Sequence, residues 1–242
     1  MAEEVPVAFS YDGATHAILM ATPDDLEDFA LGFSYTEGII TAAAEIAELA
    51  VVSVADGIVL RMWLTGDRSD AFAARRRRFV GPAGCGMCGL ESLAEANRTI
   101  PMASCDLQVT RQDIAEAVAA LPARQRLNMQ TRAVHAAAFW RSDEGLILRE
   151  DVGRHNALDK LAGALVRTGR SAAAGVIVLS SRISIELVQK AGMIGAAILV
   201  GVSAPTALAV RTAEAVGLTL VGVARDDGFE VFTHPERITQ YW

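Results

Sequence analysis

A short glycine-rich segment carries the residues with the clearest chemistry in this sequence. Cys85 and Cys88 are separated by two residues and lie among Gly84, Gly86 and Gly89. Four consecutive arginines at positions 75–78 precede the segment, and a helix is predicted to begin near residue 90. Nearby positive charge and a helix N-terminus both lower the pKa of a thiol below its free value of about 8.5. The pattern therefore predicts a reactive thiolate.

Three interpretations of this cysteine segment compete. Two cysteines at this spacing form half of a tetrahedral zinc site, which Cys105 and one of the four histidines could complete. A thioredoxin-like dithiol is the second, although the segment lacks the strand and helix pattern in which that motif sits. The third is a sulfur-handling or nucleophilic cysteine on an exposed loop, and the flanking glycines favour it over two buried structural cysteines.

A second group of polar residues occupies positions 150–156, after a predicted strand and at the start of a predicted helix. Arg154 and His155 there form a candidate anion site, because the exposed N–H groups of a helix N-terminus reinforce their positive charge. Asp151 and Asn156 are typical of helix caps. Ser180, Ser181 and Arg182 form a second polar group that suits a phosphate. No glycine-rich dinucleotide fingerprint or P-loop accompanies them.

The elements that must position these residues differ between the two halves of the chain. In the first half, strands at 5–11 and 15–21 turn at Asp12 and Gly13, and strands at 49–54 and 58–64 turn at Asp56 and Gly57. Between the two hairpins we predict a helix with Thr22 as N-cap and Pro23 as first helical residue, ending at Gly38. A short helix then precedes the arginine run, and we expect a linker or a domain boundary at residues 100–109.

In the second half, continuous apolar strands alternate with amphipathic helices. Thr110 caps a helix that Pro122 stops. Strands are predicted at 133–140, 146–149, 175–180, 196–202, 218–224 and 229–233, and helices at 156–167, 184–193 and 206–216. This pattern indicates a mainly parallel sheet covered on both faces. Because ligands bind beyond the carboxyl ends of such strands, we expect a site formed by residues 149–155, 180–184, 203–206 and 225–228.

Composition limits the class of protein. The 242 residues carry a net charge of −7, which argues against general nucleic-acid affinity. The most apolar segments, at 175–179 and 196–202, are shorter than the roughly 20 residues needed to cross a bilayer. Residues 1–4 are acidic and Pro6 interrupts early, unlike a secretory leader. We therefore expect a cytoplasmic protein, whose reducing compartment favours reactive or metal-binding cysteines over disulfides.

Taken together, these segments resemble the FdhD family of formate dehydrogenase accessory sulfurtransferases. The resemblance rests on the cysteine segment, on residues 149–161, on residues 180–191 with Arg182, Ser184, Glu186 and Lys190, and on residues 203–209. Residues 22–40 also resemble the N-terminal region of that family. The similarity covers nearly the whole chain, and residues 150–160 are its most specific part.

The resemblance implies an α/β protein in two parts. We expect an α+β N-terminal domain at residues 1–108 carrying the cysteines, and a three-layer α/β/α, cytidine-deaminase-like domain at residues 109–242. A deaminase needs a zinc-bound histidine or cysteine with a glutamate two residues on. His135 is followed by Ala136 and Ala137, so deamination is excluded on this interpretation. By itself, His135 in an alanine-rich strand is predicted to be a core histidine.

The resemblance also implies the activity and the partners. A cysteine desulfurase would load sulfur onto Cys85 as a persulfide, with Cys88 assisting, and the sulfur would pass to the molybdenum cofactor in its bis(molybdopterin guanine dinucleotide) form before insertion into formate dehydrogenase. A homodimer without a permanent metal is implied. The positions that would contact the cofactor are Val223, Ala224, Arg225, Asp226, Asp227 and Gly228, with Arg154, His155 and Arg182 as anion-binding candidates.

Two other functions are weighed against this hypothesis. The first is a non-catalytic chaperone that binds the cofactor or the apo-enzyme, with its cysteines holding a structural zinc ion. The second is a regulator that binds guanine nucleotides. A sulfur carrier needs its thiolate on an exposed and flexible loop, whereas the chaperone needs stoichiometric zinc.

Overall fold

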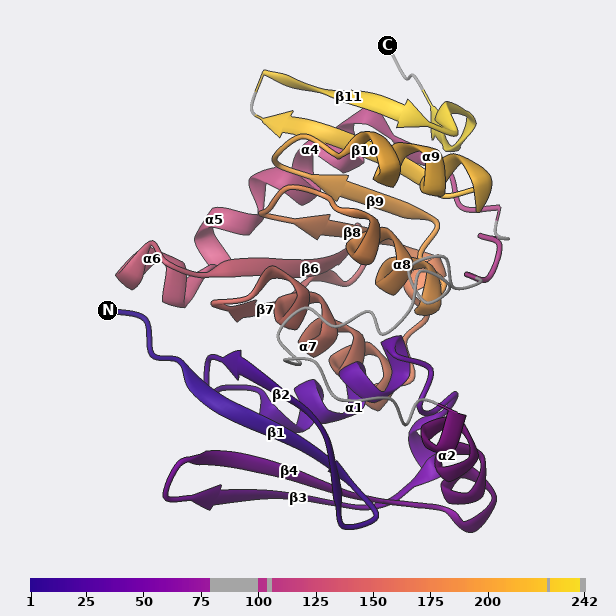
Figure 1. The fold of residues 1–242 in the computed structure, drawn as a ribbon. Helices are drawn as coiled ribbons and strands as arrows, with labels where there is room; N and C mark the ends of the chain where they lie inside the picture. The colour runs from indigo at the N-terminus through magenta and orange to yellow at the C-terminus, as the bar shows by residue number, and fades with distance from the viewer. Residues whose placement is uncertain (79–99, 104–105, 226, 240–242) are drawn as a thin grey trace.

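A computed structural model describes residues 1–78, 100–103, 106–225 and 227–239 of the chain. Two sheets dominate it, a four-stranded sheet from the first part of the chain and a six-stranded sheet from the second (Figure 1). The two sheets share no strand, and helices α1 and α7 lie between them (Figure 1). The expected α/β class is confirmed, whereas the boundary at residue 108 stays a prediction.

The four-stranded sheet has the order β2-β1-β4-β3. Its strands are β1 (Val5–Tyr11), β2 (Ala14–Ala21), β3 (Ile46–Val54) and β4 (Gly57–Leu64). Both predicted hairpins are present, and β1 and β4 pair in parallel between them. The first hairpin turns at Asp12 and Gly13, which have φ values of 50° and 81°. Positive φ at both central positions is the backbone that a tight two-residue hairpin requires.

Helix α1 (Leu26–Thr36) covers one face of this sheet and buries Phe29 and Phe33 against Phe9. The prediction that Thr22 caps the helix is wrong. The N-cap is Asp25, in a left-handed conformation without a side-chain cap. Thr22 instead bonds to Asp151, the last residue of β7, and to Val152, which follows it, so tertiary contacts take it away from the local capping role.

The arginine run also differs from the prediction. A 3-10 turn, η1 (Ala43–Glu45), precedes β3, and after β4 a single helix, α2 (Gly66–Arg78), extends to the end of the run. The arginines thus form the last helical turn instead of following a short helix. Phe72 of α2 packs on Tyr11 with ring centroids 5.0 Å apart.

The six-stranded sheet has the order β11-β10-β9-β8-β6-β7. The strands are β6 (His135–Arg141), β7 (Gly145–Asp151), β8 (Val176–Leu179), β9 (Ile198–Gly201), β10 (Thr219–Arg225) and β11 (Gly228–Thr233). The expectation of a mainly parallel sheet is wrong, because only the β8–β9 and β9–β10 pairs are parallel. Short connections make β6–β7 and β10–β11 antiparallel hairpins, and β8 joins β6 in antiparallel orientation.

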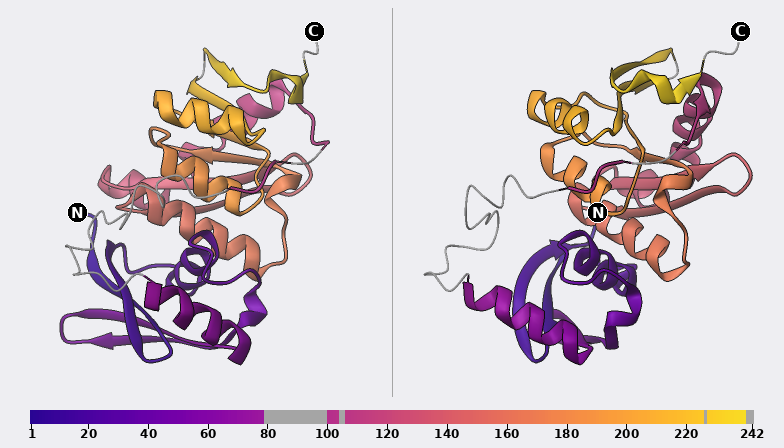
Figure 2. Two further views of the ribbon diagram at one scale, coloured as in Figure 1. Left: turned by 45° about the vertical axis from the view of Figure 1, so that its right-hand side comes forward. Right: turned by 90° about the vertical axis from the view of Figure 1, so that its right-hand side faces the viewer.

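Helices cover both faces of this sheet, as predicted. Helices α7 (Arg154–Arg167), α8 (Ile185–Met193) and α9 (Ala207–Ala215) lie on one face, and α4 (Arg111–Ala119) lies on the other (Figure 2). Thr110 and Asp113 form a capping box at the start of α4. Helix α4 ends at Ala119, two residues before the predicted end near Leu121, and Pro122 is the second residue of a further short helix, α5 (Leu121–Arg124). Helix α6 (Arg126–Thr131) then leads into β6.

The two parts of the protein meet where α1 crosses α7. Glycines occupy the crossing on both helices: a Cβ atom at Gly32 would overlap the carbonyl of Asp159, and one at Gly163 would overlap the carbonyl of Asp28. Only glycine lets the two backbones approach this closely. Smaller elements complete the fold: η2 (Ala172–Ala174), η3 (Pro235–Arg237) and the parallel pair β5 (Val109–Thr110) and β12 (Ile238–Thr239).

Among the described residues, no helix combines the length and apolar character that a membrane span requires.

Candidate functional site

The carboxyl ends of four strands meet at one edge of the six-stranded sheet. Strand β7 is antiparallel to β6, and β6 is antiparallel to β8, so β7 points in the same direction as β8, β9 and β10. The polar segments predicted to form a site therefore do converge. Because β6 runs the other way, its first residue, His135, lies at this same edge. We call this edge the strand-end site.

An open pocket of about 810 Å³ lies at the strand-end site, on the face covered by α4, α5 and α6. Two of the predicted cofactor-binding residues, Ala224 and Arg225, line it. The other lining residues come from the end of α4, from α5, α6 and the ends of β6, β8 and β9: Val118, Ala119, Leu121, Pro122, Gln125, Asn128, Val134, His135, Ser180 and Val202. The pocket therefore combines apolar walls with a few hydrogen-bonding groups, as small-molecule sites do.

His135 is a pocket residue that sequence reasoning assigned to the core. Its side chain is partly exposed, and both its burial and the nearby charge of Arg154 lower its pKa. A neutral imidazole at this position is able to accept or donate a hydrogen bond. The reversed direction of β6 places it here, and the prediction of a mainly parallel sheet hid that placement.

Glu150 fixes the pocket wall formed by α6. Its carboxylate is buried and accepts hydrogen bonds from the backbone N–H groups of Leu127 and Asn128, both at 2.8 Å. These N–H groups lie in the first turn of α6, where they have no partner within the helix. These bonds hold the start of α6 beside the pocket, which is lined by Asn128 and by Gln125, the residue before α6. Neither amide was identified from the sequence, because α6 was not predicted.

The end of β10 is distorted at the predicted cofactor-binding segment. Val223 has φ of 52°, a conformation that β-branched residues seldom adopt, and the β10–β11 register shifts between Gly222 and Arg225. Such strain is found at functional sites more often than elsewhere. Asp227 is exposed in the turn that follows and Gly228 begins β11, so neither belongs to the pocket wall. Asp226 lies outside the described residues.

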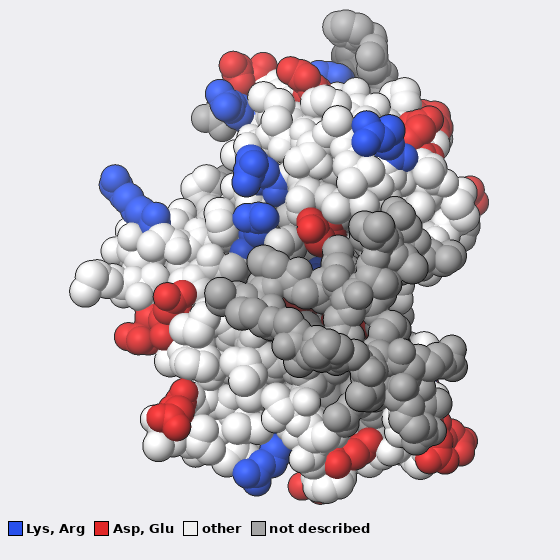
Figure 3. Space-filling model, viewed as in Figure 1, with Lys and Arg blue, Asp and Glu red and all other residues white. Residues whose placement is uncertain are grey.

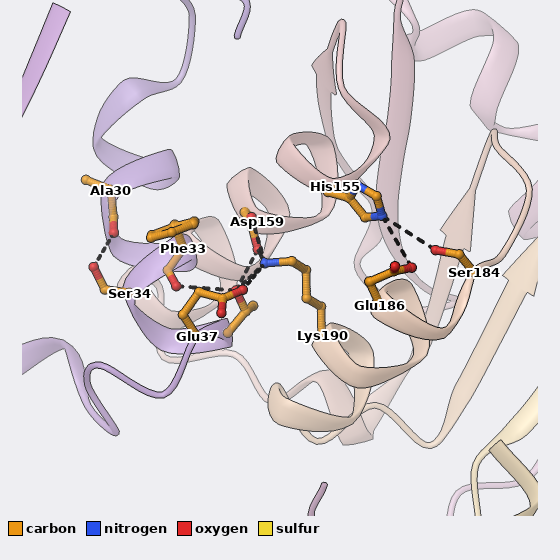
Figure 4. A network of polar contacts seen from close by, with 10 residues as sticks. Ala30, Phe33, Ser34, Glu37, His155, Asp159, Ser184, Glu186 and Lys190 are labelled. Atoms are coloured by element: carbon orange, nitrogen blue, oxygen red, sulfur yellow. Dashed lines mark hydrogen bonds and ion pairs between the residues drawn. The ribbon is translucent and has the colours of Figure 1, made fainter. Parts of the chain in front are cut away.

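A second group of polar residues lies at the N-termini of α7 and α8. His155 Nε2 is 3.5 Å from Ser184 Oγ and 4.0 Å from a carboxylate oxygen of Glu186 (Figure 4). Burial, followed by the positive charges of Arg154 and Lys190, lowers the pKa of His155 to about 4. The imidazole is therefore neutral near pH 7 despite its acidic neighbour. Ser184 is the N-cap residue of α8.

Arg154 connects the two groups electrostatically, because its charge lowers the pKa of both His135 and His155. Its Nε atom is buried and has no hydrogen-bond partner among the residues that the structure describes. Arg182 lies exposed between β8 and α8. Figure 3 shows Lys and Arg side chains gathered at the level of the β8 and β9 ends. Cationic groups at two helix N-termini form a suitable environment for phosphate oxygens.

Cys85, Cys88 and Cys105 lie outside the described residues, and nothing is described of the side chains of the arginines at 75–78. Within the described part of the chain, no three His, Cys, Asp or Glu residues are grouped so as to hold a metal ion. The roles of the cysteines therefore stay predictions.

Comparison with known proteins gives matches along nearly the whole chain. The model of the FdhD/NarQ family matches residues 2–239. The sulfur carrier protein FdhD of Agrobacterium fabrum is 52% identical over 238 residues, which cover 98% of this chain and 88% of that protein. The protein of the same name from Brucella abortus biovar 1 is 51% identical over 240 residues, covering 98% of this chain and 89% of its own.

A solved structure is similar over the same extent. It is the crystal structure of a protein from Desulfotalea psychrophila assigned as a formate dehydrogenase accessory protein. The TM-score is 0.74 at 26% sequence identity, and the match covers 98% of this chain and 89% of that one. The similarity thus extends over both sheets of this chain and the helices between them.

Proposed function

Since this chain belongs to the FdhD/NarQ family, we propose that it is a cytoplasmic sulfur carrier that serves a formate dehydrogenase. Sulfur travels as a persulfide on Cys85, and its acceptor is a molybdenum cofactor bound at the strand-end site. The observation that carries the second half of this proposal is the pocket beside Ala224 and Arg225, which opens at the edge where Arg154, His155 and Arg182 also lie.

The sulfur chemistry has two steps. The Cys85 thiolate attacks the outer sulfur of a persulfide on a cysteine desulfurase. The cysteine of the desulfurase leaves as a thiolate, and Cys85 becomes the persulfide. In the second step, the Cys88 thiolate attacks the inner sulfur of Cys85. The outer sulfur leaves as the hydrosulfide ion, HS⁻, and is thereby reduced by two electrons. The two cysteine sulfurs supply these electrons as they form the Cys85–Cys88 disulfide. A cellular dithiol reductant then restores both thiols.

The proposed cofactor form, bis(molybdopterin guanine dinucleotide), combines fused rings with phosphates. Apolar residues and the amides of Gln125 and Asn128 supply contacts for a ring system, and the cationic groups supply contacts for phosphates. His135 and His155 are both predominantly neutral near pH 7, since their pKa values are lowered. They therefore act as hydrogen-bonding groups and not as further positive charges.

The alternative is a chaperone that binds the cofactor or the apo-enzyme, with Cys85 and Cys88 as zinc ligands. Elemental analysis separates the two functions, because the chaperone requires about one zinc ion per chain and loses stability on chelation. A guanine-nucleotide-binding regulator would bind the nucleotide but transfer no sulfur.

Intact-protein mass spectrometry tests the carrier function. The protein is incubated with a cysteine desulfurase and cysteine, as wild type and as the Cys85→Ala and Cys88→Ala variants. We expect a gain of one sulfur, about 32 Da, in the wild type and in Cys88→Ala, and no gain in Cys85→Ala. A gain that persists in Cys85→Ala would exclude Cys85 as the carrier.

The desulfurase and the formate dehydrogenase catalytic subunit are the proposed protein partners, and a second copy of this chain is the third. Light scattering during size-exclusion chromatography measures the mass in solution. A mass of about twice the 25.7 kDa of one chain supports the homodimer, and a mass equal to one chain excludes it under those conditions.

A further inference from the structure

Four buried residues form a cluster that connects the turn after β7 with the end of β2: Thr22, Asp151, Asn156 and Lys160, which we call the Thr22 cluster. Asp151 is at its centre. One of its carboxylate oxygens accepts hydrogen bonds from the backbone N–H of Gly153 and the side-chain amide of Asn156, at 2.8 and 2.9 Å. The other oxygen contacts the Lys160 ammonium at 2.7 Å and accepts from the Thr22 backbone N–H at 3.0 Å.

The remaining bonds of the cluster also cross between the two parts of the protein. Lys160 Nζ donates to the Thr22 carbonyl at 2.9 Å, and Asn156 donates to the Met20 carbonyl at 2.9 Å. The Thr22 hydroxyl accepts from the backbone N–H of Val152 at 3.2 Å. Residues 151–156 therefore take their shape from residues 20–22 as well as from bonds within the turn. This use of Thr22 also explains why it does not cap α1.

The cation of the Thr22 cluster is one of only two lysines in the chain, although the sequence contains 22 Lys and Arg residues in total. Lys160 and Lys190 are both buried. An ammonium group is a compact charge with three tetrahedral donors, and in Lys160 it reaches a carboxylate and a carbonyl from one point. The planar fork of an arginine does not reproduce this geometry, so the residue type fits the contacts observed.

Two predicted anion-binding residues lie within residues 151–156, directly after the turn that the Thr22 cluster holds. Gly153 is the N-cap of α7, and Arg154 and His155 are the first residues of that helix. We propose that the Thr22 cluster positions Arg154 and His155 at the strand-end site for the phosphates of the cofactor, so that the N-terminal part of the chain shapes the cofactor-binding edge. The phosphate ligand rests on the proposed function, whereas the positioning itself does not.

A matched pair of substitutions at Thr22 tests the positioning. Thr22→Val keeps the shape of the side chain but removes the oxygen that accepts from Val152, and Thr22→Ser keeps that oxygen. The readout is the titration of the His155 ring followed by NMR, with the resonance assigned by its loss in His155→Gln. We expect a His155 pKa of about 4 in the wild type. It should rise towards 6.5, the ordinary histidine value, in Thr22→Val and stay low in Thr22→Ser.

The ligand side is measured with GDP, which shares the guanine and the diphosphate of the proposed cofactor. We expect Thr22→Val to weaken GDP binding on the order of fivefold, the loss of one hydrogen bond, and Thr22→Ser to bind like wild type. If wild type does not bind GDP, the proposed cofactor site fails, and the His155 titration still decides whether the Thr22 cluster positions the turn. An unchanged His155 pKa in Thr22→Val would overturn the positioning.

A second test removes the buried ion pair between Asp151 and Lys160 and uses the buried ion pair between Asp159 and Lys190 as its control. Lys190 contacts Asp159 at 2.9 Å and Glu37 at 2.8 Å, so it joins α8 to α7 and α1, and neither contact involves residues 151–156 (Figure 4). Asp151→Asn/Lys160→Met and Asp159→Asn/Lys190→Met each remove both members of one buried pair, which avoids leaving a fully buried charge without its partner. Glu37, the other contact of Lys190, is 26% exposed and stays in contact with solvent.

Both double variants should lose stability. After correction for the fraction of folded protein, only Asp151→Asn/Lys160→Met should weaken GDP binding, by about tenfold or more. Equal weakening in both, after correction for the folded fraction, would show that the Thr22 cluster has a merely structural role. Because the Lys190 charge acts on His155 directly, the histidine titration is read only in the Thr22 variants.

Discussion

The two sheets of this protein bury their residues in different ways. Strands β8 and β9 of the six-stranded sheet are buried at every position, because helices cover both faces. In the four-stranded sheet, α1 covers one face, and the other face exposes Ile18, Met20, Val54 and Trp63 by 45–57%. The rows of paired residues on this face run from Ile18 through Ala8 and Val59 to Val52.

This difference decides which contacts determine stability. The six-stranded sheet is stabilised by packing on both faces, so every residue of its central strands β8 and β9 contributes. The four-stranded sheet depends on α1, and α1 in turn packs on α7. The crossing of α1 with α7 therefore joins the less covered sheet to the more covered one, and substitutions there should have the largest effect.

The double variant Gly32→Ala/Gly163→Ala tests this crossing. Each added Cβ would overlap a backbone carbonyl of the opposite helix, so the helices must separate. We expect a loss of about 4 to 6 kcal/mol in the free energy of unfolding, comparable with the total stability of many domains. Urea unfolding followed by circular dichroism measures it. Gly66→Ala is the control, because a Cβ at the start of α2 contacts nothing within 4 Å; wild-type-like stability in the double variant would contradict the argument.

A pair of isoleucines compares the two sheets directly. Ile177 of β8 is fully buried, whereas Ile18 of β2 is 57% exposed. We expect Ile177→Ala to cost about 3 kcal/mol and Ile18→Ala less than about 0.5 kcal/mol, since the same atoms are removed from a packed core in one case and from a surface in the other. The same urea measurement is used for both. Similar losses would mean that the outer face of the four-stranded sheet is covered in solution.

The comparison of the sheets also shows what the sequence could predict. Local signals were sufficient for both hairpins of the first sheet and for the Thr110 cap, because turn residues and capping oxygens act within a few positions. Continuous apolar strands correctly indicated a sheet covered on both faces. The direction of β6 was missed, because burial on both faces gives the same pattern in parallel and antiparallel strands.

The candidate site was predictable to a similar degree. Polar residues after apolar strands correctly indicated the edge at which residues 150–156 and 180–184 meet. The local pattern at Thr22 and Pro23 gave a helix cap, but Thr22 bonds to residues more than a hundred positions away. His135, Gln125 and Asn128 entered the pocket through an unpredicted strand direction and an unpredicted helix. Contacts between distant segments leave no such local signal.

Helix α4 packs on the six-stranded sheet, and its cap allows a smaller test. The Thr110 hydroxyl accepts from the Asp113 N–H at 3.0 Å, and the Asp113 carboxylate accepts from the Thr110 N–H at 2.7 Å. We expect Thr110→Ala to cost about 1 kcal/mol and Thr110→Ser to cost much less. Thermal unfolding by calorimetry measures both variants. Equal losses would show that the methyl group, and not the hydroxyl, is the stabilising part.

The smallest expected effect is a pH dependence at the strand-end site of the six-stranded sheet. His155 has a pKa of about 4 in the folded protein and about 6.5 in the unfolded chain. As the pH falls from 6.5 to 4, the unfolded state takes up a proton that the folded state does not. The contribution of His155 to the free energy of unfolding is therefore complete above pH 6.5 and is lost across this window. The His155 side chain is 36% exposed, and solvent reduces the effect. The melting temperature should therefore fall slightly less between about pH 7 and pH 5 in His155→Gln than in wild type.

His234, whose pKa is raised by its contacts with Glu214 and Glu236, acts in the opposite sense in both proteins and cancels from the comparison. A larger fall in His155→Gln would mean that His155 is charged in the folded protein, and its proposed neutral contact with the cofactor would then be wrong.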